Sequence, residues 1–314
     1  MKIKELWNKI RKGVKAGMAA ATESNVLTDN RVVSMIEKFK ASGKYELMQE
    51  GERYYQADND IKNRKITRKV DGHKEEETWR ANNKLAHAKY KIQVDEKIAY
   101  LLTKPVTYKT DGTDKNDTYV EKVKDVLGKH FQYQLTQLGY EASNKGIGWL
   151  HVYLDPEGEL KTIVIPAEQC IPYWSDRSHT ELDAMIRVYN TTVWQYNQEK
   201  EITNVEIWTK DGVKYYRLEG QMLVYDNDKS MDAGGPVAHY KSVEEWKTWG
   251  KVPFIPFKNN QIEMPDIKFV KSLIDGYDLG RSEAANYMDE VKNLIFVLKG
   301  YGGQNLISFY KTAQ

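Results

Sequence analysis

The chain has 314 residues, of which 40% are hydrophobic and 29% are charged. This composition supports one large or two modest hydrophobic cores and excludes an intrinsically disordered protein. The 47 basic residues nearly cancel the 45 acidic ones, which leaves a net charge of +2. A protein whose whole surface grips nucleic acid is normally strongly basic on at least one face, so this balance argues against that class while leaving room for local patches.

The N-terminus is basic, and no membrane-spanning segment is predicted. No run of about 18 apolar residues occurs in the sequence, so nothing in it is expected to cross a bilayer. Residues 1–25 start with basic residues, and Lys9, Arg11 and Lys15 interrupt their apolar character, which is unlike a signal peptide. We expect a basic amphipathic arm, which fits a solvated terminal helix, a membrane-surface helix or a flexible contact with an anionic partner.

Helical periodicity dominates the first half of the chain. We predict helices at residues 32–40, 45–56, 77–103 and 118–140. Pro105 closes the third of these, because proline cannot continue a helix. The segment 63–77 is polar and dense in charge, and residues 111–117 form a turn-rich loop of Asp, Asn, Gly, Lys and Thr.

Strand patterns begin after Gly146. Residues 149–165 hold two alternating runs joined by Asp-Pro-Glu-Gly, and residues 205–220 repeat the arrangement around Lys-Asp-Gly. Both segments are predicted to be β-hairpins. A polar connection follows at 225–251, and a buried strand is expected just after Val252. The order of elements predicts an α+β fold with antiparallel sheet.

One long helix with two stripes is predicted from about residue 266 to 293, and it would be roughly 40 Å long. The apolar stripe consists of Ile267, Val270, Leu273, Ile274, Tyr277, Ala284, Ala285, Met288 and Val291. The polar stripe consists of Lys268, Lys271, Asp275, Asp278, Ser282, Asn286, Asp289 and Asn293. The pattern fits an ordinary amphipathic helix over a core, and it also fits a helix that stands beside copies of itself.

The sequence offers no complete catalytic, cofactor or metal site. The six histidines are scattered, and no P-loop motif is present. Cys170 is the only cysteine, which excludes an intrachain disulfide, and we expect it to be a partly buried small side chain and not a nucleophile. Asp275 and Asp278 are spaced for an acid–base pair or a divalent-ion site, but membership of the polar stripe is the favoured explanation.

Aromatic residues are abundant, with 21 tyrosines and 8 tryptophans. They could stack on single-stranded nucleic acid, or they could be cross-strand pairs and subunit contacts. The sequence therefore leaves two functional classes open at this point. One is a structural protein that assembles with copies of itself, and the other is a non-catalytic nucleic-acid-binding module that acts as a monomer or dimer.

Several segments resemble the portal proteins of tailed double-stranded DNA bacteriophages, in the type found in phages of Gram-positive hosts. They occur in that family's order and cover roughly residues 40–300. These segments are LLTKPVTY (101–108), KGIGWLHVYLDPEGEL (145–160), IPAEQCIPYWSD (165–176), MIRVYN (185–190), VPFIPFKNN (252–260), DIKFVKSLIDGYDLGRSEAAN (266–286) and FVLKG (296–300).

The resemblance implies a portal-type α+β fold with a particular domain order. Residues 1–40 would be the basic arm and first helix, and residues 41–262 would be the wing, with helices followed by antiparallel sheet. Residues 263–293 would be the stem helix, and residues 294–314 the start of the clip. Family members continue through the rest of the clip, a second stem helix, a tunnel loop and a crown, so we expect the sequence to be a fragment.

The resemblance also implies a function. About twelve copies would form a cyclic homo-oligomer at one capsid vertex of the virion. Double-stranded DNA would pass through its channel without sequence preference, driven in by a separate terminase and later ejected. Other partners would be the capsid or scaffolding protein and the head-completion proteins, with assembly in the host cytoplasm. Neither a membrane nor catalysis by this chain is implied.

Within such a ring, the two stripes of the long helix take different expected roles. The polar stripe, Lys268 through Asn293, would face the channel. Its aspartates, Asp275, Asp278 and Asp289, would form a negative wall that repels phosphate and lets DNA slide. Subunit packing would use Ile267, Val270, Ile274, Tyr277, Ala284, Met288 and Val291.

Overall fold

The computed structural model describes residues 27–109, 117–195, 198–229, 235–242 and 245–300, with side chains of the last helix described as far as Val291. The predicted basic arm, most of the 111–117 loop and residues 301–314 of the predicted clip lie outside the described residues. The fold is α+β with antiparallel sheets, as predicted. Contacts divide the chain into two compact units, Met1–Ser42 with Gln169–Val252 and Gly43–Glu168 with Pro253–Gln314. The predicted wing range is therefore shared between two units.

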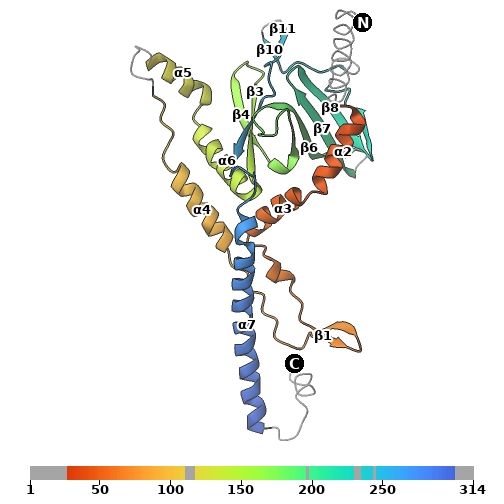
Figure 1. Ribbon diagram of the computed structural model, residues 1–314, viewed down its shortest axis with the longest axis vertical. Coiled ribbons are helices and arrows are strands. Elements are labelled where there is room, and N and C mark those ends of the chain that lie inside the picture. The colour runs from red at the N-terminus through yellow and green to blue at the C-terminus, as the bar shows by residue number, and fades with distance from the viewer. Residues whose placement is uncertain (1–26, 110–116, 196–197, 230–234, 243–244, 301–314) are drawn as a thin grey trace, which may run out of the picture. The chain divides into compact units, whose positions relative to one another are not determined.

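The first unit, here called the sheet unit, is one helix packed on a five-stranded antiparallel sheet of order β5-β6-β7-β8-β9 (Figure 1). Its helix is α2 (Asp29–Lys40), whose Val32 and Ile36 are four residues apart and share a face buried against Ile186 and Val205. Its strands are β5 (Cys170–Trp174), β6 (Leu182–Gln195), β7 (Gln198–Thr209), β8 (Gly212–Glu219), β9 (Met222–Tyr225), and the separate pair β10 (Tyr240–Ser242) and β11 (Glu245–Lys247).

The second unit, here called the helix unit, combines helices with a three-stranded antiparallel sheet of order β12-β3-β4. Its helices are α3 (Gly43–Tyr55), η1 (Asp60–Asn63), α4 (Lys89–Leu102), α5 (Asp117–Leu127), α6 (Phe131–Lys145) and α7 (Ile267–Gly300). Its strands are β3 (Ile147–Leu154), β4 (Leu160–Ile165), β12 (Phe254–Lys258) and the exposed hairpin β1 (Thr67–Val70) with β2 (His73–Glu76). The short helix η2 (Ala167–Gln169) lies at the boundary of the units.

Most predicted elements are confirmed, two predicted helices need correction, and one hairpin was not predicted. The two short helices before residue 56, both hairpins, the strand after Val252 and the long helix all form. The predicted helix at 77–103 is helical only from Lys89, and the predicted 118–140 helix is divided in two. Gly128 causes the division, because its φ of 71° is left-handed and cannot continue an α-helix. The charge-dense stretch 63–77 contains an unpredicted hairpin, paired in part by Arg68 and Glu75.

The core of the helix unit joins α3, α4 and α7. It is built from Tyr54, Tyr90, Val94, Ile98, Ile267 and Ile274, all buried. The three α4 residues in this core recur every four positions, which places them on one face of that helix. The first two turns of α7 are therefore fixed inside its own subunit by apolar contacts.

Helices α3 and α6 approach closely, because α3 has glycine at the contact. A Cβ added to Gly51 would lie 2.0 Å from the carbonyl oxygen of Asn144. Next to this contact the ammonium of buried Lys145 lies 2.9 Å from Glu141 and 2.8 Å from Glu168. Burial lowers the pKa of Lys145, but the two carboxylates outweigh burial and raise it above its usual range.

Asp266 anchors the N-terminal end of α7. Its backbone N–H donates to the Ser143 carbonyl at 2.9 Å, and its carboxylate accepts from Lys97 at 2.6 Å, from Asn259 at 2.8 Å and from the Ser143 hydroxyl. Burial raises the pKa of this carboxyl, but the three hydrogen bonds and the Lys97 charge outweigh burial and lower it. A carboxylate at this end also interacts favourably with the helix dipole.

Replacing Gly51 by alanine should destabilise the protein by about 1–3 kcal/mol, because the new methyl group overlaps the Asn144 carbonyl. The matched control is Gly43→Ala at the start of the same helix, where an added Cβ meets nothing within 4 Å. That variant should be neutral or stabilised by up to about 1 kcal/mol. Urea unfolding followed by circular dichroism measures both, and equal effects would refute the close-contact explanation.

Replacing Asp266 by asparagine should have a pH-dependent cost. The pKa of Asp266 is lower in the folded state, so its contribution is present above the ordinary aspartate pKa of about 3.9 and is lost as pH falls through the folded value. The free energy of unfolding should therefore drop by about 1–3 kcal/mol at pH 7, and the gap from the parent should narrow below about pH 4. A gap independent of pH, measured by urea unfolding, would contradict this assignment.

Candidate functional site

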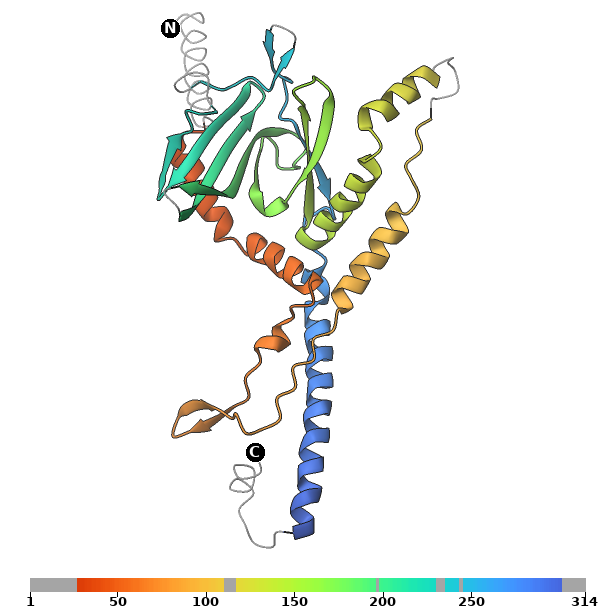
Figure 2. The same ribbon diagram turned by 180° about the vertical axis from the view of Figure 1, so that it is seen from behind.

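An extended segment of the helix unit lies along one side of α7 (Figures 1 and 2). We call residues 82–88 the strap, because they connect the β1–β2 hairpin region to α4 while bonding to α7. Alternate backbone N–H groups of the strap each donate to a polar side chain of α7. These bonds are Asn83 N to Asn286 Oδ1 at 2.6 Å, Leu85 N to Ser282 Oγ at 3.0 Å, and His87 N to Asp278 Oδ1 at 3.2 Å.

The regularity of these bonds follows from two backbone repeats. Four residues along an α-helix advance about 6 Å, and two residues along an extended chain advance about 6.6 Å. Side chains spaced by four on α7 can therefore meet every second amide of an extended chain. The strap runs in the opposite direction to the helix, so rising residue numbers in the strap meet falling numbers in α7. We call Asp278, Ser282 and Asn286 the polar ladder.

The strap buries the polar ladder almost completely. Asp278 and Ser282 are 0% exposed and Asn286 is 4% exposed. Buried polar groups need hydrogen-bond partners, and the strap amides supply them to one side-chain oxygen of each ladder residue. Asp278 also accepts from the Asn59 amide at 2.5 Å and lies 2.9 Å from His87 Nδ1. The prediction that the polar stripe is open to a channel therefore needs correction at these three positions, which are covered by their own subunit.

Other members of the predicted polar stripe are also paired within the subunit, but less deeply. Lys271 lies 2.5 Å from Asp60 and 2.8 Å from Asp275, and Asp275 accepts from the Tyr54 hydroxyl. Burial lowers the pKa of Lys271, but its hydrogen bonds to Asp275 and Asp60 outweigh burial and raise it. Asp275 and Asp278 of the predicted negative wall therefore accept hydrogen bonds from donors in the same chain. Lys268, at the start of the polar stripe, is exposed.

The ties between α7 and the preceding loop continue toward the C-terminal end of the helix. Asp289 accepts from the Asn83 side chain at 2.9 Å. Glu290 accepts from Arg80 at 3.2 Å, and Glu283 pairs with Arg64. These outer ion pairs are partly exposed, so each contributes little on its own. Asn293, also predicted in the polar stripe, falls outside the residues whose side chains are described.

The apolar stripe is divided between the subunit's own core and solvent. Ile267 and Ile274 are buried in the core of the helix unit, and Val270 packs against it. Their predicted role in subunit packing is corrected to a role inside the subunit. The remaining part of the stripe is open, and large apolar side chains are exposed along it. These are Leu273, Tyr277 and Met288 of the stripe, with Phe269 and Tyr287 beside it, and Leu273 is the most exposed at 73%.

Three small residues lie on the same exposed face of α7. Gly276, Gly280 and Ala284 are spaced by four and are exposed. A Cβ added to Gly276 or Gly280 would meet nothing within 4 Å, so neither glycine is required by packing inside the subunit. Each costs about 1 kcal/mol of helix stability relative to alanine.

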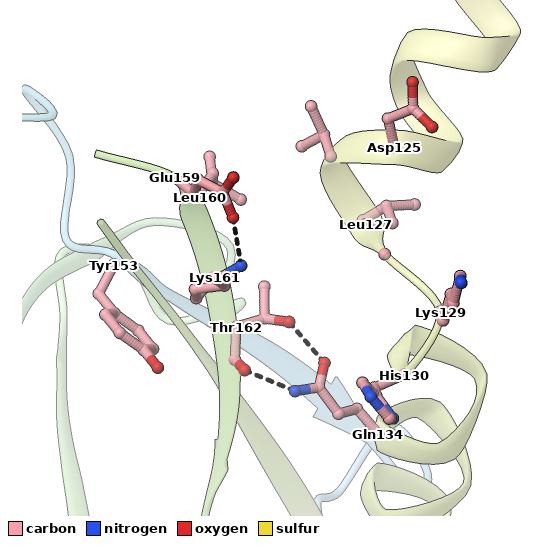
Figure 3. A pocket seen from close by; sticks show the side chains of 12 residues that line it. Asp125, Leu127, Lys129, His130, Gln134, Tyr153, Glu159, Leu160, Lys161 and Thr162 are labelled. Atoms are coloured by element: carbon pink, nitrogen blue, oxygen red, sulfur yellow. Dashed lines mark hydrogen bonds and ion pairs between the residues drawn. The ribbon is translucent and has the colours of Figure 1, made fainter. Parts of the chain in front are cut away.

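A hollow of about 620 Å³ lies between α5–α6 and β3–β4. Figure 3 shows Leu127, Lys129 and Gln134 on the helical side and Glu159 and Thr162 on the strand side. Gln134 and Thr162 form two hydrogen bonds across it. The side-chain amide N–H of Gln134 donates to the Thr162 carbonyl, and the Thr162 hydroxyl donates to the side-chain oxygen of Gln134. Gln134 and Thr162 are thus engaged with each other, as are Glu159 and Lys161.

The two carboxylates singled out from the sequence bond to different partners and not to each other. Asp275 bonds to Tyr54 and Lys271, whereas Asp278 points to the strap. Among the described residues, no group of three or more His, Cys, Asp or Glu side chains is placed to hold a metal ion. Cys170 is buried, more completely than predicted. Within the same residues, no helix is long and apolar enough to cross a membrane.

The strap was not predicted from the sequence, because the pattern of residues 77–88 indicates a helix. A signal was present in the repeat of four that places Asp278, Ser282, Asn286 and Glu290 in line on α7. That repeat indicates a continuous polar face, but it does not say whether water or another part of the chain satisfies it. The strap residues Asn83, Leu85 and His87 carry no motif of their own, because all three ladder bonds use their backbone amides.

Known proteins match most of this chain. Residues 41–313 match the family described as phage portal protein, SPP1 Gp6-like. The portal protein of Bacillus phage SPP1 is 33% identical over 274 residues, covering 87% of this chain and 52% of that protein. The portal protein of Clostridium phage phiCD119 is 31% identical over 281 residues, covering 86% of this chain and 58% of that protein.

These matches agree with the resemblance carried by the sequence segments between residues 101 and 300. The chain spans about half to three-fifths of the length of the curated relatives that it matches. The family match covers well over half of the chain, from the start of α3 to beyond α7. The chain therefore belongs to the phage portal proteins of the SPP1 Gp6-like family.

Proposed function

We propose that this chain is one subunit of a cyclic portal ring that forms a DNA channel at a capsid vertex. Family membership gives the structural role in a phage portal. The observation that carries the ring assignment is the inverted surface of α7, which buries its polar ladder and exposes apolar side chains. An exposed apolar helix face is normally covered by another protein surface.

A second copy of the same chain is the proposed cover for this face. Leu273, Tyr277 and Met288 supply apolar area, and Gly276 and Gly280 let another backbone approach closely. In a ring, each subunit offers one side to one neighbour and a different side to the other, and the contact repeats until it closes. Of the packing residues predicted from sequence, Tyr277, Ala284 and Met288 remain proposed for this role, together with Val291.

The channel surface proposed from the structure is closer to neutral than the sequence predicted. Lys271 is paired with Asp60 and Asp275, and Asp278 is withdrawn beneath the strap. Paired charges attract phosphate only weakly. They therefore support passage of double-stranded DNA with weak binding and no sequence preference. Lys268, Lys271, Asp275 and Asp289 remain the stripe members proposed to face the channel.

The wider assembly follows from the portal role. We expect about twelve subunits, contacts with a terminase, a capsid or scaffolding protein and head-completion proteins, and a place in the virion after assembly in the host cytoplasm. We also propose that the chain is not an enzyme, because Asp275 and Asp278 serve structural partners. ATP hydrolysis or DNA cleavage by the purified protein that disappears on Asp275→Asn would refute that.

Replacing Leu273 by aspartate should raise the subunit concentration needed for ring formation at least about tenfold, because a charge would be buried between subunits. The subunit itself should stay folded, since this side chain is 73% exposed. The matched control is Ser272→Asp, which adds the same charge about 100° around the helix at an exposed position and should assemble normally. Mass photometry across a dilution series measures both.

The test applies to a parent protein of the full length of its relatives that forms closed rings in electron micrographs, and such a parent that stays monomeric or dimeric would refute the ring itself. Equal assembly of Leu273→Asp and Ser272→Asp would show that the wrong face has been assigned. Ile274→Asp is not a test of assembly, because Ile274 is buried in the subunit core and its replacement should unfold the helix unit.

A further inference from the structure

We infer that the strap is a splint that keeps α7 straight across Gly276 and Gly280, and that α7 bends there when the strap detaches. The inference is independent of ring formation, because every contact it uses lies within one subunit. It concerns a segment of α7 that has two glycines on one side and two rungs of the polar ladder, Asp278 and Ser282, on the other.

The glycines make this segment intrinsically weak. Gly276 and Gly280 are exposed one turn apart, and nothing lies within 4 Å of the position that a Cβ would occupy at either. Glycine has more backbone freedom than any other residue, and sharp bends in helices occur preferentially at a few features, glycine among them. Alanine would fit both positions without collision, so packing within the subunit does not explain the glycines.

The ladder braces this segment from the opposite side. Asp278 and Ser282 each follow a glycine by two residues, which places them roughly 200° around the helix from it. Leu85 N–H reaches Ser282 at 3.0 Å and His87 N–H reaches Asp278 at 3.2 Å. Asn59 adds a third bond, to Asp278 at 2.5 Å. A bend at the glycines would change the spacing of the rungs, which would then no longer match the spacing of the strap amides.

A splint must itself be fixed at its ends. Beyond its C-terminal end, Tyr90 of α4 is buried in the core of the helix unit and donates to the Ser143 carbonyl at 3.2 Å. Toward its N-terminal end, the Asn82 side chain donates to the Arg64 carbonyl at 3.3 Å, and Asn83 bonds to both Asn286 and Asp289. The strap is therefore held on both sides of the glycine segment.

Hydrogen exchange on a double-mutant cycle tests the splint. The first variant is Ser282→Ala with Asn286→Ala, which removes two rungs while raising intrinsic helix propensity. The second is Gly276→Ala with Gly280→Ala, and the third combines all four changes. Amide exchange is measured by mass spectrometry in peptides covering residues 276–286 and 82–88, with all proteins in the same oligomeric state.

Loss of the rungs should speed exchange of α7 amides at 276–286 at least about fivefold in the glycine background. In the alanine background the same loss should change the exchange rate of these amides by less than about twofold. Strap amides should exchange faster in both backgrounds. Ser272→Ala on the exposed side of α7 and Gly43→Ala in α3 are the matched controls, and neither should alter exchange at 276–286.

Two results would overturn the inference. Unchanged or slower exchange of α7 on loss of the rungs would show that the ladder does not brace the helix. An equal increase in the glycine and alanine backgrounds would show that the glycines are not the site of bending. Circular dichroism confirms that each variant is folded, and a single rung variant, Ser282→Ala, repeats the comparison if the double change prevents folding.

Discussion

The helix unit depends on a match between two backbone repeats. An α-helix brings every fourth residue to the same face about every 6 Å, and an extended chain brings every second amide to the same side at nearly that distance. Asp278, Ser282 and Asn286 occupy one repeat and the amides of the strap occupy the other. This match lets a polar helix face be buried without a sheet or an apolar partner. It also fixes the point along α7 at which the chain coming from the β1–β2 hairpin meets the helix.

The acceptor oxygens of the polar ladder are satisfied within the chain, and the apolar face of α7 is left on the surface. In an ordinary amphipathic helix the apolar side covers the core and the polar side meets water. Here α7 follows that rule only for its first two turns, through Ile267 and Ile274. On the rest of its surface the rule is reversed, and Leu273, Tyr287 and Met288 are exposed to solvent. The reversal makes one helix both a structural part of its own chain and the surface on which the proposed ring contact depends.

Much of this arrangement could be predicted from the sequence, because it depends on local signals. Alternating strands around Asp-Pro-Glu-Gly gave one hairpin, and the helical period gave α7 and its two stripes. The environment of each stripe could not be predicted, since hydrophobic period tells which residues share a face and not what covers that face. The strap was missed for a related reason. Its residues resemble a weak helix, and their extended form depends on Asp278 and its neighbours about 200 positions further along.

The two sides of the polar ladder, the strap and α7, should differ in how many substitutions they tolerate. The strap contributes backbone amides, which nearly every amino acid except proline possesses, so Leu85 could be exchanged for many residues without loss of its ladder bond. The helix contributes side-chain oxygens at fixed positions, and Ser282 can be replaced only by residues that place an acceptor in the same small space. Natural variation in this family should therefore be permissive at position 85 and restrictive at 278 and 282, with proline as the residue that the strap excludes at positions 83, 85 and 87.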